Sequence, residues 1–104
     1  MNENHRDPLS ELQDWYAAAC NGDWEHSYGV KVDTLDNPGW MLTVDLRETA
    51  WERLALPMKS VERSERDWFD YEISDGTFRA SGGPRNLEEM IKAFLRIVRN
   101  APTG

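Results

Sequence analysis

This 104-residue sequence lacks features that several large protein classes require. It contains one cysteine, Cys20, so no disulfide can form within the chain. No run approaches the roughly 18 consecutive apolar residues that a membrane-spanning helix needs. The first residues have no apolar segment of the kind that forms the core of a secretory signal peptide. Together these absences are typical of a protein of the reducing cytoplasm, and a cytoplasmic protein is what we expect.

Positive charge is also scarce. Twelve Lys and Arg stand against nineteen Asp and Glu, which gives a formal net charge of −7 at pH 7. A negative field repels nucleic acid and anionic membrane surfaces and attracts basic partners. The balance therefore disfavours a nucleic-acid or membrane-binding protein and favours a basic protein partner, although such charge also serves solubility alone.

Aromatic side chains, by contrast, are plentiful. The chain has five Trp, with 39% hydrophobic and 30% charged residues overall. This composition suits a folded protein with one modest core, and each buried Trp contributes a large apolar area to it. We expect a single domain over residues 1–104, with an ordered core over about 8–100.

Apolar residues recur at helical spacing near each end of the chain. The first helix is expected to begin near Pro8 or Ser10 and to end at Asn21-Gly22. The second is expected to begin after Asn86, with Glu89 three residues on as in a capping box. An apolar stripe along this second helix predicts that it packs on a sheet. The stripe consists of Leu87, Met90, Ile91, Phe94, Leu95 and Val98.

Between the helices, apolar and polar residues alternate as they do in strands. Residues 30–46 predict a hairpin closed by Asn37-Pro38-Gly39, and residues 68–81 predict a second one closed by Asp75-Gly76. A further strand over the polar residues 59–65 would lie at an edge. The expected fold is α+β: an antiparallel sheet of about five strands with an N-terminal and a C-terminal helix packed on one face.

Residues 47–58 give a weaker pattern. Thr49 could cap a short helical turn that carries Trp51 and Leu54, and Pro57 would end it.

The least generic stretch covers residues 21–29 and continues over 34–40. It places acids beside aromatic side chains and contains one of only two histidines, the other being His5 in a lead-in over residues 1–7 that is expected to fray. Aromatic anchors ringed by acids are what a surface needs to bind a basic protein. The candidate contact residues are Asp23, Trp24, Glu25, His26, Tyr28 and Asp36. Whether the aromatic members point outward as anchors or fold inward to organise the loop stays open.

Part of this stretch also allows a catalytic or metal-binding interpretation. Asp23, Glu25 and His26 could bind a metal or transfer protons. Their spacing matches no metal motif, and a metal site needs three or four converging ligands. We therefore predict no catalytic residue, no metal site and no cofactor. A small metal-binding protein or hydrolase built on these three residues is the alternative.

Several residue blocks, in order along the chain, resemble one protein family. Two long blocks, residues 22–29 and 34–40, are specific, and shorter blocks extend the likeness over roughly residues 11–95. The shorter blocks are Trp15-Tyr16, Asp45-Leu46, Glu62-Arg63-Ser64-Glu65, Asp67-Trp68, Asp75-Gly76, Gly82-Gly83-Pro84 and Asn86-Leu87. In these blocks the chain is similar to the immunity 53 family, small bacterial proteins that protect a cell from a toxin encoded beside them.

The resemblance implies an immunity protein of a bacterial polymorphic toxin system. Such a protein binds its cognate toxin in the cytoplasm and blocks it, without catalysis of its own. The expected partner is a cognate toxin domain, basic by the charge argument, with no nucleic acid and no membrane involved.

Overall fold

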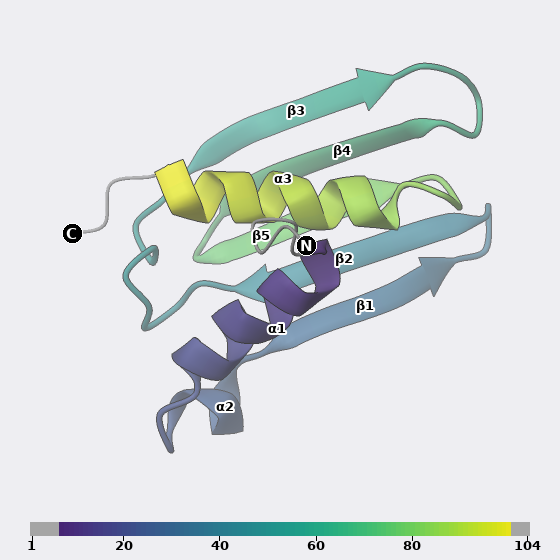
Figure 1. Cartoon of the computed structure of the whole chain (residues 1–104). Helices are drawn as coiled ribbons and strands as arrows, with labels where there is room; N and C mark the ends of the chain where they lie inside the picture. Colours follow the sequence, from purple (N-terminus) through teal and green to yellow (C-terminus); the bar gives the residue numbers. More distant parts are fainter. Residues whose placement is uncertain (1–6, 101–104) are drawn as a thin grey trace, which may run out of the picture.

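In the computed structural model, residues 7–100 are described, and they form one antiparallel sheet with helices on one of its faces (Figure 1). Apart from Asp7, the predicted lead-in with His5 lies outside the described residues. Within residues 7–100, no helix is long and apolar enough to cross a membrane. In chain order the elements are α1 (Pro8–Ala19), α2 (Trp24–Ser27), β1 (Val30–Leu35), β2 (Gly39–Asp45), β3 (Leu56–Glu62), β4 (Trp68–Ser74), β5 (Thr77–Gly82) and α3 (Leu87–Asn100).

The five strands lie in the order β1-β2-β5-β4-β3, and every neighbouring pair is antiparallel. The last strand in sequence therefore lies at the centre of the sheet, and β1 and β3 are its edges. Both longer helices cover the same face, α3 along the middle of the sheet and α1 beside it towards β1 (Figure 1). The predicted α+β architecture is confirmed.

Both predicted hairpin turns are present. The Asn37–Pro38 peptide between β1 and β2 is cis. Between β4 and β5, Asp75 and Gly76 have φ values of 52° and 71°. These values match the two-residue turn that Asp-Gly favours, because its backbone twist agrees with that of the strands it joins.

The core lies between the sheet and α3. Along β2, Leu42 and Val44 are fully buried, whereas Met41, which precedes them, is 37% exposed, as the alternation in the sequence predicts. The apolar stripe of α3 packs on these strands, with Phe94 edge-on to Phe78 at a ring separation of 5.3 Å. Burial of this stripe fixes which face of the sheet carries the helices.

Residues 47–58 differ from the expectation. No helical turn forms after Thr49; instead its hydroxyl donates to the Leu46 carbonyl and accepts from the Trp51 N–H within a series of turns. Pro57 does not end a helix but lies inside β3, which begins three residues earlier than predicted. An edge strand tolerates proline because one side of its backbone has no partner to lose.

The starts of the two longer helices are held by different side chains. α1 begins at Pro8, one of the two expected starts, and the carboxylate of its N-cap, Asp7, accepts the Ser10 N–H at 2.8 Å. Asn86 precedes α3, but its side chain turns towards the sheet and accepts the Trp68 N–H at 3.3 Å. Its amide nitrogen donates to the Glu89 side chain, so the reciprocal backbone bonds of a capping box are replaced by a side-chain pair.

Candidate functional site

Trp24, one of the six candidate contact residues, is folded into the protein. It is 1% exposed, and its indole N–H donates to the Arg47 carbonyl at 2.9 Å. Its ring lies 6.0 to 6.2 Å from the rings of Trp15, Tyr16 and Tyr28. Trp15 in turn contacts Phe94 of the core. Trp24 therefore anchors α2 to the rest of the chain and is not available to a partner in this conformation.

Glu25 also holds the segment together. Its carboxylate accepts the backbone N–H groups of Asn21 and Gly22 at 2.9 to 3.2 Å. Hydrogen bonds from its own backbone N–H and from those two residues lower the pKa of Glu25. The Asn21 side chain adds two more bonds, from the N–H groups of Asp23 and Trp24. The segment predicted as a loop is thus a short helix, α2, and hydrogen bonds to the side chains of Asn21 and Glu25 fix the backbone around its start.

The other four candidates reach the surface, but not as one patch. Asp23 and His26 are exposed near α2, and Tyr28 is half-buried behind them. Asp36 is exposed on the β1–β2 turn, at the opposite end of β1. At about 3.3 Å per residue, the six residues of β1 extend over roughly 17 Å. We expected Asp36 to lie beside the 22–28 segment and to form one acidic patch with it. This expectation is wrong, because an extended strand separates them.

For the metal-binding alternative, the three residues do not converge. No group of three or more His, Cys, Asp and Glu within residues 7–100 is placed to hold a metal ion. Glu25 directs its carboxylate to backbone amides, while Asp23 and His26 are exposed.

A shallow apolar groove lies beside the 22–28 segment, between α1 and β1. Its volume is about 280 Å³, and its lining consists of Leu12, Gln13, Tyr16, Gly29 and Val30. Tyr16 is 41% exposed, and two further exposed apolar side chains lie on the same two elements, Leu9 at 57% and Val32 at 44%. Leu9, Tyr16 and Val32 belong to the apolar faces of the first predicted helix and the first predicted hairpin, but in the structure these three side chains remain exposed.

A polar network closes the other end of the sheet. Asn86, 2% exposed, donates to Asp67 at 3.0 Å and to Glu89 at 2.8 Å. Arg63 contacts the same two carboxylates, at 2.7 Å and 2.6 Å. Hydrogen bonds from Asn86 and then Arg63 lower the pKa of Asp67, and Arg63 followed by Asn86 lowers that of Glu89. The network ties the β3–β4 turn to the first turn of α3.

The backbone packs tightly around this network. The Gly83 N–H donates to the Trp68 carbonyl, and the Trp40 indole N–H donates to the Pro84 carbonyl. Two shallow depressions flank the loop before α3, with volumes of about 490 and 300 Å³. Arg66 and Pro84 line both depressions, and Arg85 lines the larger one.

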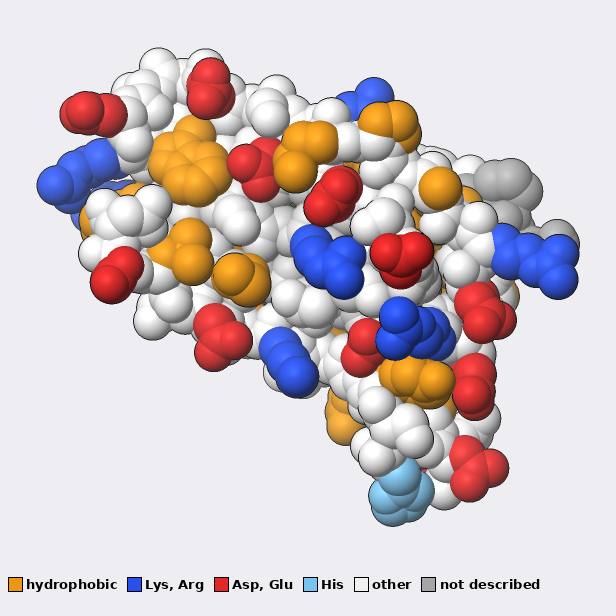
Figure 2. All heavy atoms as spheres, turned by 180° about the vertical axis from the view of Figure 1, so that it is seen from behind, with side chains coloured by type: hydrophobic (Ala, Val, Ile, Leu, Met, Phe, Trp, Pro, Cys, Tyr) orange, Lys and Arg blue, Asp and Glu red, His pale blue; other side chains and the backbone are white. Residues whose placement is uncertain are grey.

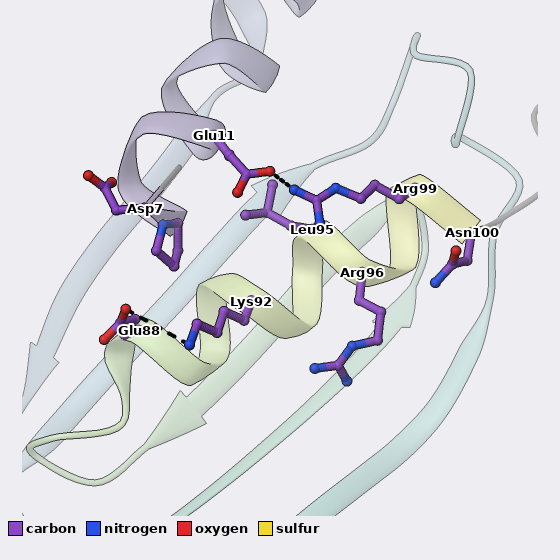
Figure 3. A pocket seen from close by; sticks show the side chains of 9 residues that line it. Asp7, Glu11, Glu88, Lys92, Leu95, Arg96, Arg99 and Asn100 are labelled. Atoms are coloured by element: carbon purple, nitrogen blue, oxygen red, sulfur yellow. Dashed lines mark ion pairs between the residues drawn. The ribbon is translucent and has the colours of Figure 1, made fainter. Parts of the chain in front are cut away.

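A larger groove, of about 610 Å³, lies between α1 and α3 (Figure 3). Its charged side chains are largely paired with one another. Arg99 of α3 forms an ion pair with Glu11 of α1, and Lys92 pairs with Glu88 along α3 at 4.0 Å. The Arg99–Glu11 pair joins the two helices, whereas the Lys92–Glu88 pair lies within α3.

The face of the sheet opposite the helices carries acidic side chains interspersed with basic and hydrophobic ones (Figure 2). Burial, with Glu72 and Glu62 nearby, raises the pKa of Asp70 on β4. Among residues 7–100 no Lys or Arg forms an ion pair with these three acids. This face thus contributes to the negative field that surrounds the molecule.

Residues 9–99 match the family model described as immunity protein 53. The chain belongs to the immunity protein 53 family. No curated protein and no solved structure matches it. Membership in this family supports an immunity function and implies a toxin as the partner.

The residue blocks that resemble the immunity 53 family meet at the two ends of the sheet. Trp15-Tyr16, residues 22–29 and Asp45-Leu46 meet around Trp24, and the Asp45 carboxylate accepts the Gly29 N–H. Most of the other blocks meet around Asn86. Sequence reasoning placed the blocks in order but missed this convergence, because their contacts join residues about 20 to 45 positions apart.

Proposed function

We propose that this chain binds a cognate bacterial toxin in the cytoplasm and neutralises it by occupying its surface, without catalysis of its own. The family match over residues 9–99 carries the proposal.

The charge of the chain favours a basic partner. The net charge of −7 attracts a positively charged toxin surface and accelerates the encounter. Electrostatic attraction of this kind falls with ionic strength, because added salt screens exposed charges over about 8 Å at physiological concentration.

For the contact surface we propose the exposed members of the candidate set. Asp23 and His26 near α2 and Asp36 on the β1–β2 turn reach solvent, and Tyr28 is partly accessible. Trp24 and Glu25 support them from within: Trp24 packs among three aromatic rings, and Glu25 holds the backbone before α2.

Charge reversal at Asp23 and Asp36 tests this surface. Glu25 stays unchanged, because its removal would release two backbone amides and confuse binding with folding. We expect D23K/D36K to lose protection when it is co-expressed with the toxin encoded beside it, while its melting midpoint stays nearly unchanged.

A matched control reverses two exposed acids at other places on the surface, Glu52 and Glu62. It makes the same change in net charge, so it separates a local contact from the general field. Full protection by D23K/D36K would show that neither acid belongs to the contact surface. Equal loss in both double variants would assign the effect to net charge alone.

A further inference from the structure

The two edges of the sheet are protected to different degrees. β3 contains Pro57 and a register shift between Leu56 and Lys59, features that hinder pairing with another strand. β1 has neither: all six of its residues pair in register with β2, without a bulge or a proline. Its four middle residues are exposed, and within residues 7–100 it pairs with β2 alone.

The hydrogen-bond pattern shows which backbone groups of β1 lack a partner strand. The Asp45 N–H donates to the Gly29 carbonyl, so Gly29 directs its backbone groups towards β2. In an antiparallel ladder this orientation repeats at every second residue. The N–H and C=O groups of Val30, Val32 and Thr34 therefore point away from β2, along the free edge.

The side chains of Val30, Val32 and Thr34 point to one face of the sheet, and the groove between α1 and β1 lies on that face. Val30 and Val32 lie opposite the buried Val44 and Leu42, which places their side chains on the helix-covered face. Leu12 and Tyr16 form the opposite wall of the groove. A strand added to β1 would place every second side chain over this groove, which favours apolar residues at those positions.

Acidic side chains stand at both ends of this edge. Asp23 lies before β1, Asp33 lies within it, and Asp36 follows it, with Lys31 as the one basic residue of the strand. The candidate contact residues, which do not form one patch, thus bracket a single free strand edge. An incoming strand with basic residues near its ends complements this arrangement.

We propose that the toxin is bound by β-strand addition: an extended segment of the toxin, apolar at alternate positions and basic towards its ends, pairs with the free edge of β1. This inference rests on the proposed function, since it takes the toxin as the partner. It adds which strand is used and what kind of segment occupies it.

Proline substitution at one residue of each edge provides the test. In Val32→Pro the lost N–H is one that points away from β2, so the β1–β2 ladder keeps all its bonds while the added strand loses one and meets the ring. Ser60→Pro is the matched control on β3. The Arg63 N–H donates to the Asp67 carbonyl, so by the same alternation the Ser60 N–H points away from β4.

The measurement is binding to the purified toxin domain encoded beside this chain, made inactive by substitution. We expect V32P to weaken the affinity by about tenfold or more and S60P to leave it unchanged, with both variants folded by circular dichroism. Unchanged affinity of a folded V32P would overturn strand addition while leaving the proposed function intact. Absence of binding by the unaltered chain would overturn the proposed function, and the inference with it.

Amide hydrogen exchange on the unaltered chain gives an answer that does not depend on the folding of a variant. We expect the toxin domain to slow exchange at Val30, Val32 and Thr34, whose amides point outward, and to change Lys31 and Asp33 little. Binding without slower exchange at the three outward amides contradicts the inference. Slowing that depends on the concentration of this chain alone would assign the edge to a second copy and also overturn it.

Discussion

At the scale of single residues, Trp24 shows how one side chain can hold a candidate contact segment in place. Its indole is buried between α1, α2 and the chain after β2, and its N–H satisfies the Arg47 carbonyl. We expect Trp24→Ala to lower the free energy of unfolding by about 3–5 kcal/mol, as measured by urea denaturation. Trp24→Phe should cost less, since it keeps most of the apolar area and loses mainly the hydrogen bond.

An unchanged midpoint in Trp24→Ala would show that the ring is dispensable for folding. It would also restore Trp24 as an outward anchor for the toxin, the alternative that the sequence alone left open.

Gly83 shows how closely the backbone packs before α3. A Cβ at this position would lie 2.2 Å from the Arg66 carbonyl oxygen and 2.8 Å from the Asn86 side-chain oxygen. We expect Gly83→Ala to destabilise the protein by about 1–3 kcal/mol, because backbone atoms must move to admit the methyl group.

Gly29→Ala is the matched control. A Cβ there meets nothing within 4 Å, and Gly29 is not among the residues with positive φ. Its free energy of unfolding should change by no more than about 0.5 kcal/mol, the range of ordinary surface substitutions. Equal effects of the two substitutions would contradict the close packing around Gly83.

At the scale of elements, the Arg63 network predicts how stability depends on pH. The folded-state pKa values of Asp67 and Glu89 lie below their ordinary values of about 3.9 and 4.3. A carboxyl with a lowered folded pKa contributes stability that is fully present above its unfolded pKa and is lost as the pH falls through the folded one. The attachment of α3 to the β3–β4 turn should therefore weaken below about pH 4.

The variant Arg63→Gln tests this attachment. Its free energy of unfolding should be lower than that of the unaltered chain at pH 7, and the difference should shrink as the pH falls towards 3. Lys92→Gln, which breaks an exposed pair with Glu88 at 4.0 Å, should leave the pH dependence unchanged. A difference for Arg63→Gln that is constant across this range would show that the ion pairs do not contribute through these carboxyls.

Much of the arrangement of elements could be predicted from the sequence, because it follows from periodicity and turn chemistry. The apolar stripe of α3, the alternation in β2 and the Asp75-Gly76 turn each specify local structure with few competing options. The segment over 47–58 could not be predicted, because its proline is compatible with a helix end or with an edge strand. Only the pairing of β3 with β4 decides between them.

The candidate site was predicted less well, for a physical reason. Nearness in sequence does not give nearness in space here, because β1 carries Asp36 away from Asp23. The inward orientation of Trp24 depends on its contacts with Trp15, Tyr16 and the Arg47 carbonyl, and no local sequence pattern predicts these contacts. The toxin-binding role of the six residues stays a prediction.

At the scale of the whole molecule, the chain combines a net negative charge, a helix-covered core and a sheet whose edge strand β1 pairs with β2 without a bulge or a proline. A protein that acts by binding consumes one copy for each toxin molecule, whereas an enzyme that modifies or destroys the toxin does not. Stoichiometry therefore separates the proposed function from a catalytic one more directly than any single variant.

The most direct measurement is a titration of the active toxin encoded beside this chain with purified protein, followed by the toxin's own activity. We expect the remaining activity to fall linearly and to reach zero at one equivalent, at once and independently of incubation time. Removal of the protein should restore the activity. Loss of toxin activity at a small fraction of an equivalent, progressing with time, would contradict neutralisation by binding, as would full activity at excess.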